Sequence, residues 1–119
     1  MKRTYQTSVD LPESEHKKTL DELKLGYLNL SDGMFEQAKL NFLLALQYDS
    51  KCADAYWGLM LCKFQIKNED ELYSDPVTYK SVLYLPECEK ALEFAEENQR
   101  KQFNSLLERI YQVNEGDNY

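Results

Sequence analysis

The side chains that could carry catalytic chemistry are few and lie far apart in the sequence. His16 is the one histidine, and it stands beside Lys17 and Lys18 near the start of a helical pattern. The one hydroxyl near it, Ser14, suits a helix cap better than a nucleophile, because serine is a favoured N-cap residue. We therefore expect His16 to be solvated and the chain not to be an enzyme.

The cysteines and the acidic runs lack the spacing of a metal site. Cys52, Cys62 and Cys88 form an odd set without a Cys-x-x-Cys pair, which indicates buried, reduced thiols rather than disulfides or a zinc site. The acidic runs 69–71 and 96–97 do not space their oxygen ligands as a calcium loop does, so we interpret both as solvated faces. We expect no metal ion and no cofactor.

The composition indicates one folded, acidic domain. Of the 119 residues, 14 are Lys or Arg and 21 are Asp or Glu, which gives a formal net charge of −7. A hydrophobic content of 43% is too high for an intrinsically disordered chain. An acidic surface repels nucleic acid and anionic membranes, so we expect neither as a partner, whereas a basic or neutral protein fits the charge. No apolar run has the length of a signal peptide or a membrane span, which predicts a cytoplasmic protein.

Apolar residues recur at offsets of three and four along most of the chain, which predicts helices. The predicted helices span about 14–30, 35–48, 52–66, 86–95 and 97–114. Pro86 followed by Glu87 and Glu89 suits the start of the fourth helix and its dipole. Leucines surround most of the second helix, so we expect it to lie between two neighbours.

The spacing of turn residues and prolines divides the chain into three parts. We expect a flexible arm over 1–13, a single helical domain over 14–114 and a frayed tail over 115–119. The pattern does not define the structure of 67–86, within which 77–85 fits either a short strand or a helical turn.

An internal repeat appears when the chain is compared with itself at an offset of 34 residues. At that offset Leu25 falls on Leu59, Leu23 on Trp57 and Leu30 on Phe64. The chain also carries the pattern Leu25-Gly26, Gly33-x-Phe35, Ala38-x3-Phe42-x2-Ala45-Leu46, the turn Asp49-Ser50, and then Ala53-Asp54-Ala55-Tyr56. This pattern resembles the tetratricopeptide repeat, a helix-turn-helix unit of 34 residues, over residues 15–66. Residues 75–112 also look like the tail of tetratricopeptide segments in uncharacterised bacterial proteins, many of them Firmicute. The resemblance implies an all-α fold, an antiparallel helix-turn-helix stack with a divergent C-terminal helical cap.

Some positions follow the packing of that repeat and others depart from it. Gly26 is small where two helices would cross, and Phe42 would pack against the helix at 52–66. Four positions depart from the repeat pattern. In the first repeat, Glu22 replaces the usual Trp and Asn29 replaces the usual Tyr. In the second repeat, Met60 replaces the usual Gly and Pro76 stands where a Phe is expected.

The resemblance implies a concave groove lined by the first helix of each repeat. Carried over position by position, the lining comprises Leu20, Leu23, Tyr27, Leu30, Asp54, Trp57, Leu61 and Phe64. Because Trp and Tyr are common binding anchors, we expect a non-catalytic module that binds a peptide or helix of a partner protein there. The family's clamp for C-terminal carboxylates is not expected, because Leu23, Tyr27 and Trp57 stand where it needs Lys, Arg and Asn.

Two alternatives to an open groove stay open. The last helix, through Phe103, Leu107 and Ile110, would fill the groove as a cap, since one and a half repeats leave much apolar surface uncovered. Two copies would instead bury each other's apolar stripe as a homodimer. The exposure of Trp57 distinguishes an open groove from one that the chain fills itself.

Overall fold

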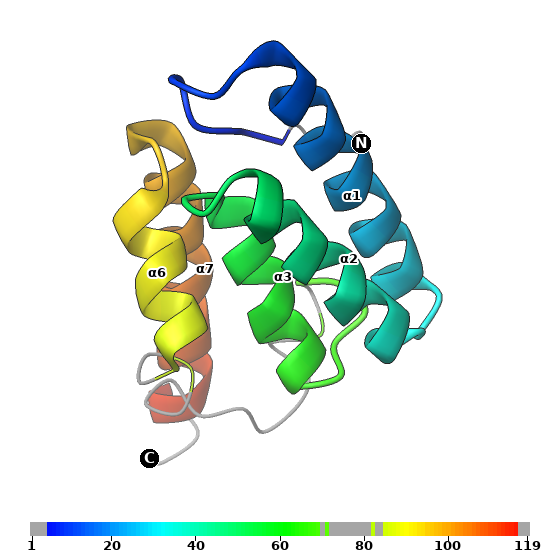
Figure 1. Cartoon of the computed structure of the whole chain (residues 1–119). Coiled ribbons are helices and arrows are strands. Elements are labelled where there is room, and N and C mark those ends of the chain that lie inside the picture. Colours follow the sequence, from blue (N-terminus) through cyan, green and yellow to red (C-terminus); the bar gives the residue numbers. More distant parts are fainter. Residues whose placement is uncertain (1–4, 70, 72–81, 83–84, 117–119) are drawn as a thin grey trace.

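The computed structural model describes residues 5–69, 71, 82 and 85–116. Five helices lie within these ranges: α1 (Glu13–Ser31), α2 (Phe35–Tyr48), α3 (Ala53–Lys63), α6 (Pro86–Phe94) and α7 (Glu97–Gly116) (Figure 1). None of the described residues is in a strand, so the predicted all-α class is confirmed. The region 77–85, which fitted a strand or a helical turn, lies outside the described residues except for Val82 and Leu85.

The helix starts follow the predicted pattern at α6 but not at α1. Pro86 is the first residue of α6, where its fixed φ suits the helix and its missing N–H costs nothing. The prediction that Ser14 caps α1 is wrong, because the helix begins at Glu13 with Pro12 as its N-cap. Ser14 lies within the first turn, and its Oγ instead donates a hydrogen bond to Glu15 Oε2 at 2.6 Å.

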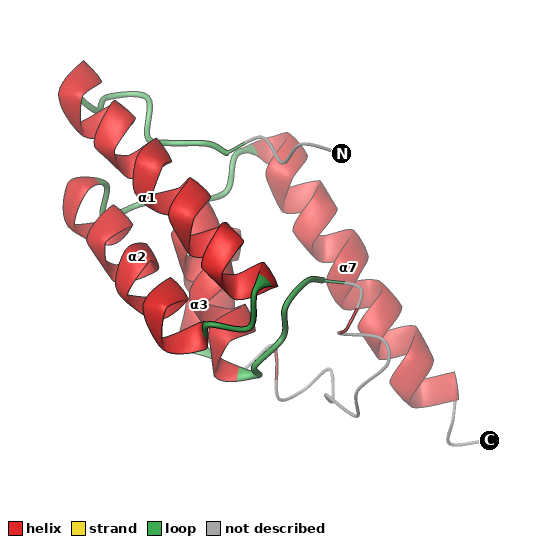
Figure 2. Cartoon of the chain, turned by 90° about the vertical axis from the view of Figure 1, so that its right-hand side faces the viewer, coloured by secondary structure: helices red, strands yellow, loops and turns green. Residues whose placement is uncertain are grey.

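The helices stack largely in chain order. α1 and α2 form an antiparallel hairpin, and Figure 2 shows the two running side by side. α3 packs against α2 on one side and α6 on the other, so it lies between the hairpin and the α6–α7 pair (Figure 1). The stack is elongated, with principal extents of 52 × 29 × 27 Å.

Phe42 of α2 is held between glycines of the two neighbouring helices. A Cβ atom at Gly26 of α1 would lie 2.6 Å from Phe42 Cε1, and one at Gly58 of α3 would lie 2.4 Å from Phe42 Cζ. Both distances are shorter than a carbon–carbon contact allows, so the ring needs glycine on each side. The predicted contact of Phe42 with the third helix and the packing reason for Gly26 are confirmed. The role of Gly58 was not recognised in the sequence.

A chain of polar side chains crosses the seam between α1 and α2. Asn29 Nδ2 donates to Asn41 Oδ1 at 2.8 Å, and Asn41 Nδ2 donates to Glu22 Oε2 at 3.0 Å. Glu22 and Asn29 are two of the positions that depart from the tetratricopeptide pattern. Asn41 bonds to both of them, so the seam keeps its polar groups satisfied where that pattern would place aromatic rings.

Candidate interaction surfaces

The predicted groove residues lie where α1, α3 and their neighbours meet, and most of them are buried. Leu23, Leu30, Asp54, Trp57 and Leu61 are at most 1% exposed, Tyr27 is 8% exposed, and Leu20 and Phe64 are half-buried. The structure therefore brings these side chains together as interior packing. Three of them, Tyr27, Leu30 and Leu61, also line a hollow of about 360 Å³ beside Tyr5.

The C-terminal helix α7 covers the Trp57 end of this set. The rings of Trp57 and Phe103 stack with their centroids 4.2 Å apart and their planes 9° from parallel. Trp57 Nε1 also donates to Glu69 Oε1 at 3.2 Å, so the polar edge of the indole is satisfied. Leu107 and Ile110 follow Phe103 into the core. This is the arrangement of Trp57 that a groove filled by the chain's own last helix requires.

The N-terminal arm, by which we mean residues 5–12 from here on, covers the other end. The Tyr5 ring stacks on Tyr27 with centroids 5.3 Å apart, and the Gln6 backbone N–H donates to Asp54 Oδ2 at 2.9 Å. Tyr27 OH in turn donates to the Asp54 carbonyl oxygen at 2.6 Å. The part of the predicted flexible arm that the structure describes is thus attached to α1 and α3.

The candidate chemical residues lie in surroundings that do not activate them. His16 is exposed, and its Nδ1 forms a hydrogen bond with Thr7 Oγ1. The three cysteines are free and buried, and burial raises the pKa of Cys52 to about 12 and those of Cys62 and Cys88 to about 11. Thiols with such pKa values are protonated at neutral pH and are poor nucleophiles. Over the described ranges, no group of three His, Cys, Asp or Glu residues could hold a metal ion.

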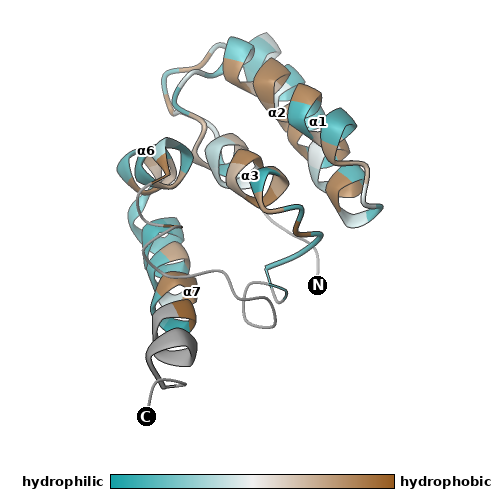
Figure 3. Ribbon diagram, turned by 90° about the horizontal axis from the view of Figure 1, so that it is seen from below, coloured by the Kyte–Doolittle hydropathy of each residue, from teal (hydrophilic) through white to brown (hydrophobic). Residues whose placement is uncertain are grey.

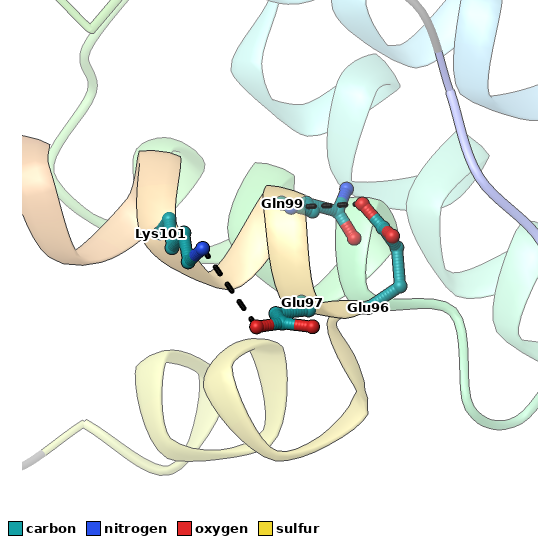
Figure 4. Close-up of polar contacts among 4 residues, drawn as sticks. All are labelled: Glu96, Glu97, Gln99 and Lys101. Atoms are coloured by element: carbon teal, nitrogen blue, oxygen red, sulfur yellow. Dashed lines mark hydrogen bonds and ion pairs between the residues drawn. The ribbon is translucent and has the colours of Figure 1, made fainter.

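The acidic run at 96–97 lies at the corner between α6 and α7. Glu96 Oε1 accepts a hydrogen bond from the Gln99 backbone N–H at 2.9 Å, which caps the start of α7, and Lys101 Nζ lies 3.7 Å from Glu97 Oε1 (Figure 4). Arg100 donates from Nε to the Leu92 carbonyl oxygen and from Nη2 to that of Ala95, each at 2.9 Å. These contacts bind the last turn of α6 to the first turn of α7.

The corner residues separate into two kinds. The Glu97–Lys101 pair is a solvated surface contact, since both side chains are mostly exposed. Glu96 and Arg100 instead satisfy backbone groups at helix ends, which is a structural role.

Five of the exposed large hydrophobic side chains that the structure describes lie on the side of the α1–α2 hairpin that faces away from the core. They are Leu25 and Leu28 of α1 and Leu40, Leu43 and Leu44 of α2, which are 38% to 58% exposed. We call these five residues the leucine face, and hydrophobic positions are visible along both helices in Figure 3. The second helix does lie between two neighbours, α1 and α3, as predicted, but these contacts leave Leu40, Leu43 and Leu44 exposed. Its core stripe packs, but the opposite side of the helix meets solvent.

A hollow adjoins the leucine face at Leu43. Its volume is about 390 Å³, and its apolar walls include Phe35, Leu43 and Leu59. Lys39 and Lys63 are among its polar residues. A hollow with apolar walls and a charged edge suits a bulky apolar side chain of another molecule.

Comparisons with known proteins add no relative. No protein-family model matches the chain, and comparison with curated proteins and with solved structures found no match. The tetratricopeptide resemblance therefore stays a prediction from the sequence. In the part of the chain that the structure describes, none of the helices combines the length and the apolarity needed to cross a bilayer.

Proposed function

We propose that this chain is a non-catalytic protein-interaction module whose partner contacts the leucine face. The observation that carries the proposal is that five leucines lie accessible on the side of α1 and α2 opposite the core. Other positions on that side are charged or amide residues, such as Asp21, Glu36 and Gln47. Large apolar side chains gathered among polar ones are typical of a surface that another protein covers.

The hollow beside Leu43 supports an anchored contact. A partner helix or loop lying across the leucine face could place one aliphatic or aromatic side chain between Phe35 and Leu59. Anchors of this kind, set in a pocket and surrounded by apolar contacts, supply most of the affinity at protein interfaces. The tetratricopeptide resemblance supports the same class of function, since such repeats bind other proteins.

The charge of the chain favours a different protein over a second copy. Two chains with a formal net charge of −7 each repel one another, whereas a neutral or basic partner does not. The buried free thiols fit a reducing compartment, and we place the interaction in the cytoplasm. A homodimer through the leucine face is the competing outcome that the experiment must separate.

Site-specific cross-linking tests this proposal. A photo-reactive amino acid at position 40 of the full chain should cross-link a partner in cells of the source organism. The same amino acid at position 93, an exposed residue of α6, should not. The variant Leu40→Gln/Leu44→Gln should bind the cross-linked partner about 10-fold or more weakly, because it loses apolar contact area at the interface.

Controls separate binding from folding. The variant Glu89→Gln/Glu93→Gln changes two exposed residues of α6, away from the leucine face, and should leave partner binding intact. Circular dichroism and thermal melting should show each variant folded. Unchanged partner binding by Leu40→Gln/Leu44→Gln would contradict the proposal. A dimer in sedimentation experiments that this variant abolishes would assign the face to a second copy instead.

A further inference from the structure

Two segments of the chain cover the predicted groove, and they differ in how deeply they are built into the core. α7 contributes Phe103, Leu107 and Ile110, all at most 3% exposed. No residue of the arm is buried, and Val9 is 97% exposed. Removing α7 would take three buried side chains out of the core, whereas the arm contributes no buried side chain of its own. Local release of the arm therefore needs far less free energy than global unfolding.

The arm is held mainly by hydrogen bonds to carboxylates. The Ser8 backbone N–H donates to Asp49 Oδ2 at 2.8 Å, and Ser8 Oγ donates to Asp49 Oδ1 at 2.6 Å. The Gln6 backbone N–H donates to Asp54, and Gln6 Nε2 donates to Glu96 Oε1 at 3.3 Å. All four of these donors are neutral groups of the arm, and every acceptor belongs to the body of the protein.

An aromatic ring and a thiol complete the surface beneath the arm. Tyr5 covers the ring of Tyr27, and Cys52 Sγ lies 3.7 Å from the Gln6 carbonyl oxygen and donates to it. Cys52 is 1% exposed with the arm in place. We call the surface formed by Tyr27, Asp49, Cys52, Asp54 and Glu96 the arm site. Figure 1 shows the arm, in dark blue, reaching from α1 toward the corner between α6 and α7.

We propose that the arm is an autoinhibitory strap over a second binding site, and that the arm site takes an extended, positively charged segment of a partner chain. The seated arm shows what the site accepts: an aromatic ring on Tyr27, then backbone and hydroxyl donors to Asp54 and Asp49. A cationic side chain forms a charge-assisted hydrogen bond to a carboxylate, roughly twice as strong as a neutral one. A basic segment that brings such side chains to Asp49, Asp54 and Glu96 can therefore compete with the four neutral donors of Gln6 and Ser8.

The arm competes because it is tethered. A tethered segment acts at an effective concentration of about millimolar. A partner segment must therefore bind the arm site with a Kd well below millimolar to displace the arm. The arm site adjoins the leucine face only at Leu28, which lines one hollow with Tyr5 and Tyr27. This inference does not depend on binding at the leucine face. Substitutions in the arm and in the leucine face test the two proposals separately.

Peptide binding to full-length variants tests the strap. The probe is a fluorescein-labelled peptide with the sequence of residues 1–12, which carries Lys2, Arg3 and Tyr5. The variant Tyr5→Ala/Ser8→Ala weakens the strap, and Val9→Ala is the matched control because Val9 is exposed. By fluorescence anisotropy, the weakened chain should bind the peptide at least 10-fold more tightly than the Val9→Ala chain. Replacing both basic residues of the peptide by serine should weaken binding about 10-fold or more.

A charge-removing substitution locates the binding. Glu96→Gln keeps an acceptor for the cap of α7 but removes one charge from the arm site, and Asp54→Asn removes another. In the Tyr5→Ala/Ser8→Ala chain, either substitution should weaken peptide binding several-fold while circular dichroism shows the chain folded. Glu93→Gln, on an exposed face of α6, should not.

Three outcomes would overturn the proposal. Equal peptide affinity of the weakened and Val9→Ala chains would show that the arm does not compete. If neither the weakened chain nor the Val9→Ala chain bound the peptide, the arm site would not accept a basic extended segment. A concentration-dependent dimer of the unmodified chain that the peptide dissociates would assign the site to the arm of a second copy rather than to a partner chain.

Discussion

The ring of Trp57 stacks on the ring of Phe103, with centroids 4.2 Å apart and planes 9° from parallel. This contact joins α3 to α7, and both side chains are buried. It places the single tryptophan inside the protein, where a binding groove would have exposed it. The interaction surfaces that we propose lie instead on the outer side of the hairpin and beneath the arm.

Phe103→Ala should destabilise the protein and expose Trp57. Loss of a buried aromatic ring costs about 3–5 kcal/mol in free energy of unfolding, and α7 loses its ring contact with Trp57 of α3. Tryptophan emission of the folded variant should shift to longer wavelength, and urea denaturation should show the loss of stability. Asn104→Ala, at the next and exposed position, is the control and should change neither. An unchanged emission maximum would show that Phe103 does not shield the indole.

Gly58→Ala should destabilise the protein through Phe42. The added Cβ would lie 2.4 Å from Phe42 Cζ, and overpacking of this kind costs about 1–3 kcal/mol. This exceeds the gain of about 1 kcal/mol in helix propensity where the ring cannot move aside. In Phe42→Leu the smaller side chain leaves room, so the double variant should be more stable than the sum of the single effects predicts. Strict additivity in urea denaturation would contradict the packing argument.

Asn41→Leu should leave two polar groups of the α1–α2 seam without their present partner. Asn29 Nδ2 and Glu22 Oε2 each lose a hydrogen bond, which costs about 1–3 kcal/mol where water cannot replace it. Replacing Glu22, Asn29 and Asn41 together by apolar residues should be less costly than Asn41→Leu alone, because no group is then left unsatisfied. Thermal denaturation of both variants checks the order.

Arg100→Ala should loosen the corner between α6 and α7. Its guanidinium donates to the carbonyl oxygens of Leu92 and Ala95, and loss of such charged donors costs about 1.5–3 kcal/mol. Arg100→Lys should restore little, because an ammonium lacks the planar fork that reaches both carbonyls. The neighbouring Lys101→Ala is the control and should change stability by less than about 1 kcal/mol, since its ion pair with Glu97 is exposed. Equal effects of the two alanine substitutions would argue against a specific role for Arg100.

Stability should fall as the pH rises above 9. Burial raises the pKa of the Cys52 thiol from its ordinary value of 9.0 to about 12 in the folded protein. The unfolded chain therefore releases this proton at a lower pH than the folded chain does. The contribution is fully present below pH 9 and is lost between pH 9 and pH 12, by roughly 1 kcal/mol per pH unit.

Urea denaturation at pH 7.5 and pH 10 measures this pH dependence. Cys52→Ala should lose less stability between the two values than the unmodified chain, because it lacks one of the three buried thiols. Equal losses in both chains would show that Cys52 does not contribute. Cys62 and Cys88, whose pKa values are raised by burial to about 11, account for part of the dependence that remains.

The sequence by itself determined the helices and much of the core. Offsets of three and four predicted α2, α6 and the start of α7 to within one or two residues, because helix formation and its apolar stripe are local properties. The same spacing placed Leu23, Phe42 and Ile110 on the apolar stripes of their helices, and all three are fully buried. Gly26 was correctly assigned to a close helix crossing, since only a missing side chain permits one.

Tertiary structure alone decided which apolar residues face solvent. Trp57 and Leu40 look alike in a hydrophobic pattern, yet one is 0% exposed and the other 55%. The difference arises because α7 and the arm, distant in sequence, return to cover α3, whereas no described segment covers the outer side of α2. Periodicity records which residues share a helix face. Only the packing of distant segments decides whether that face is covered.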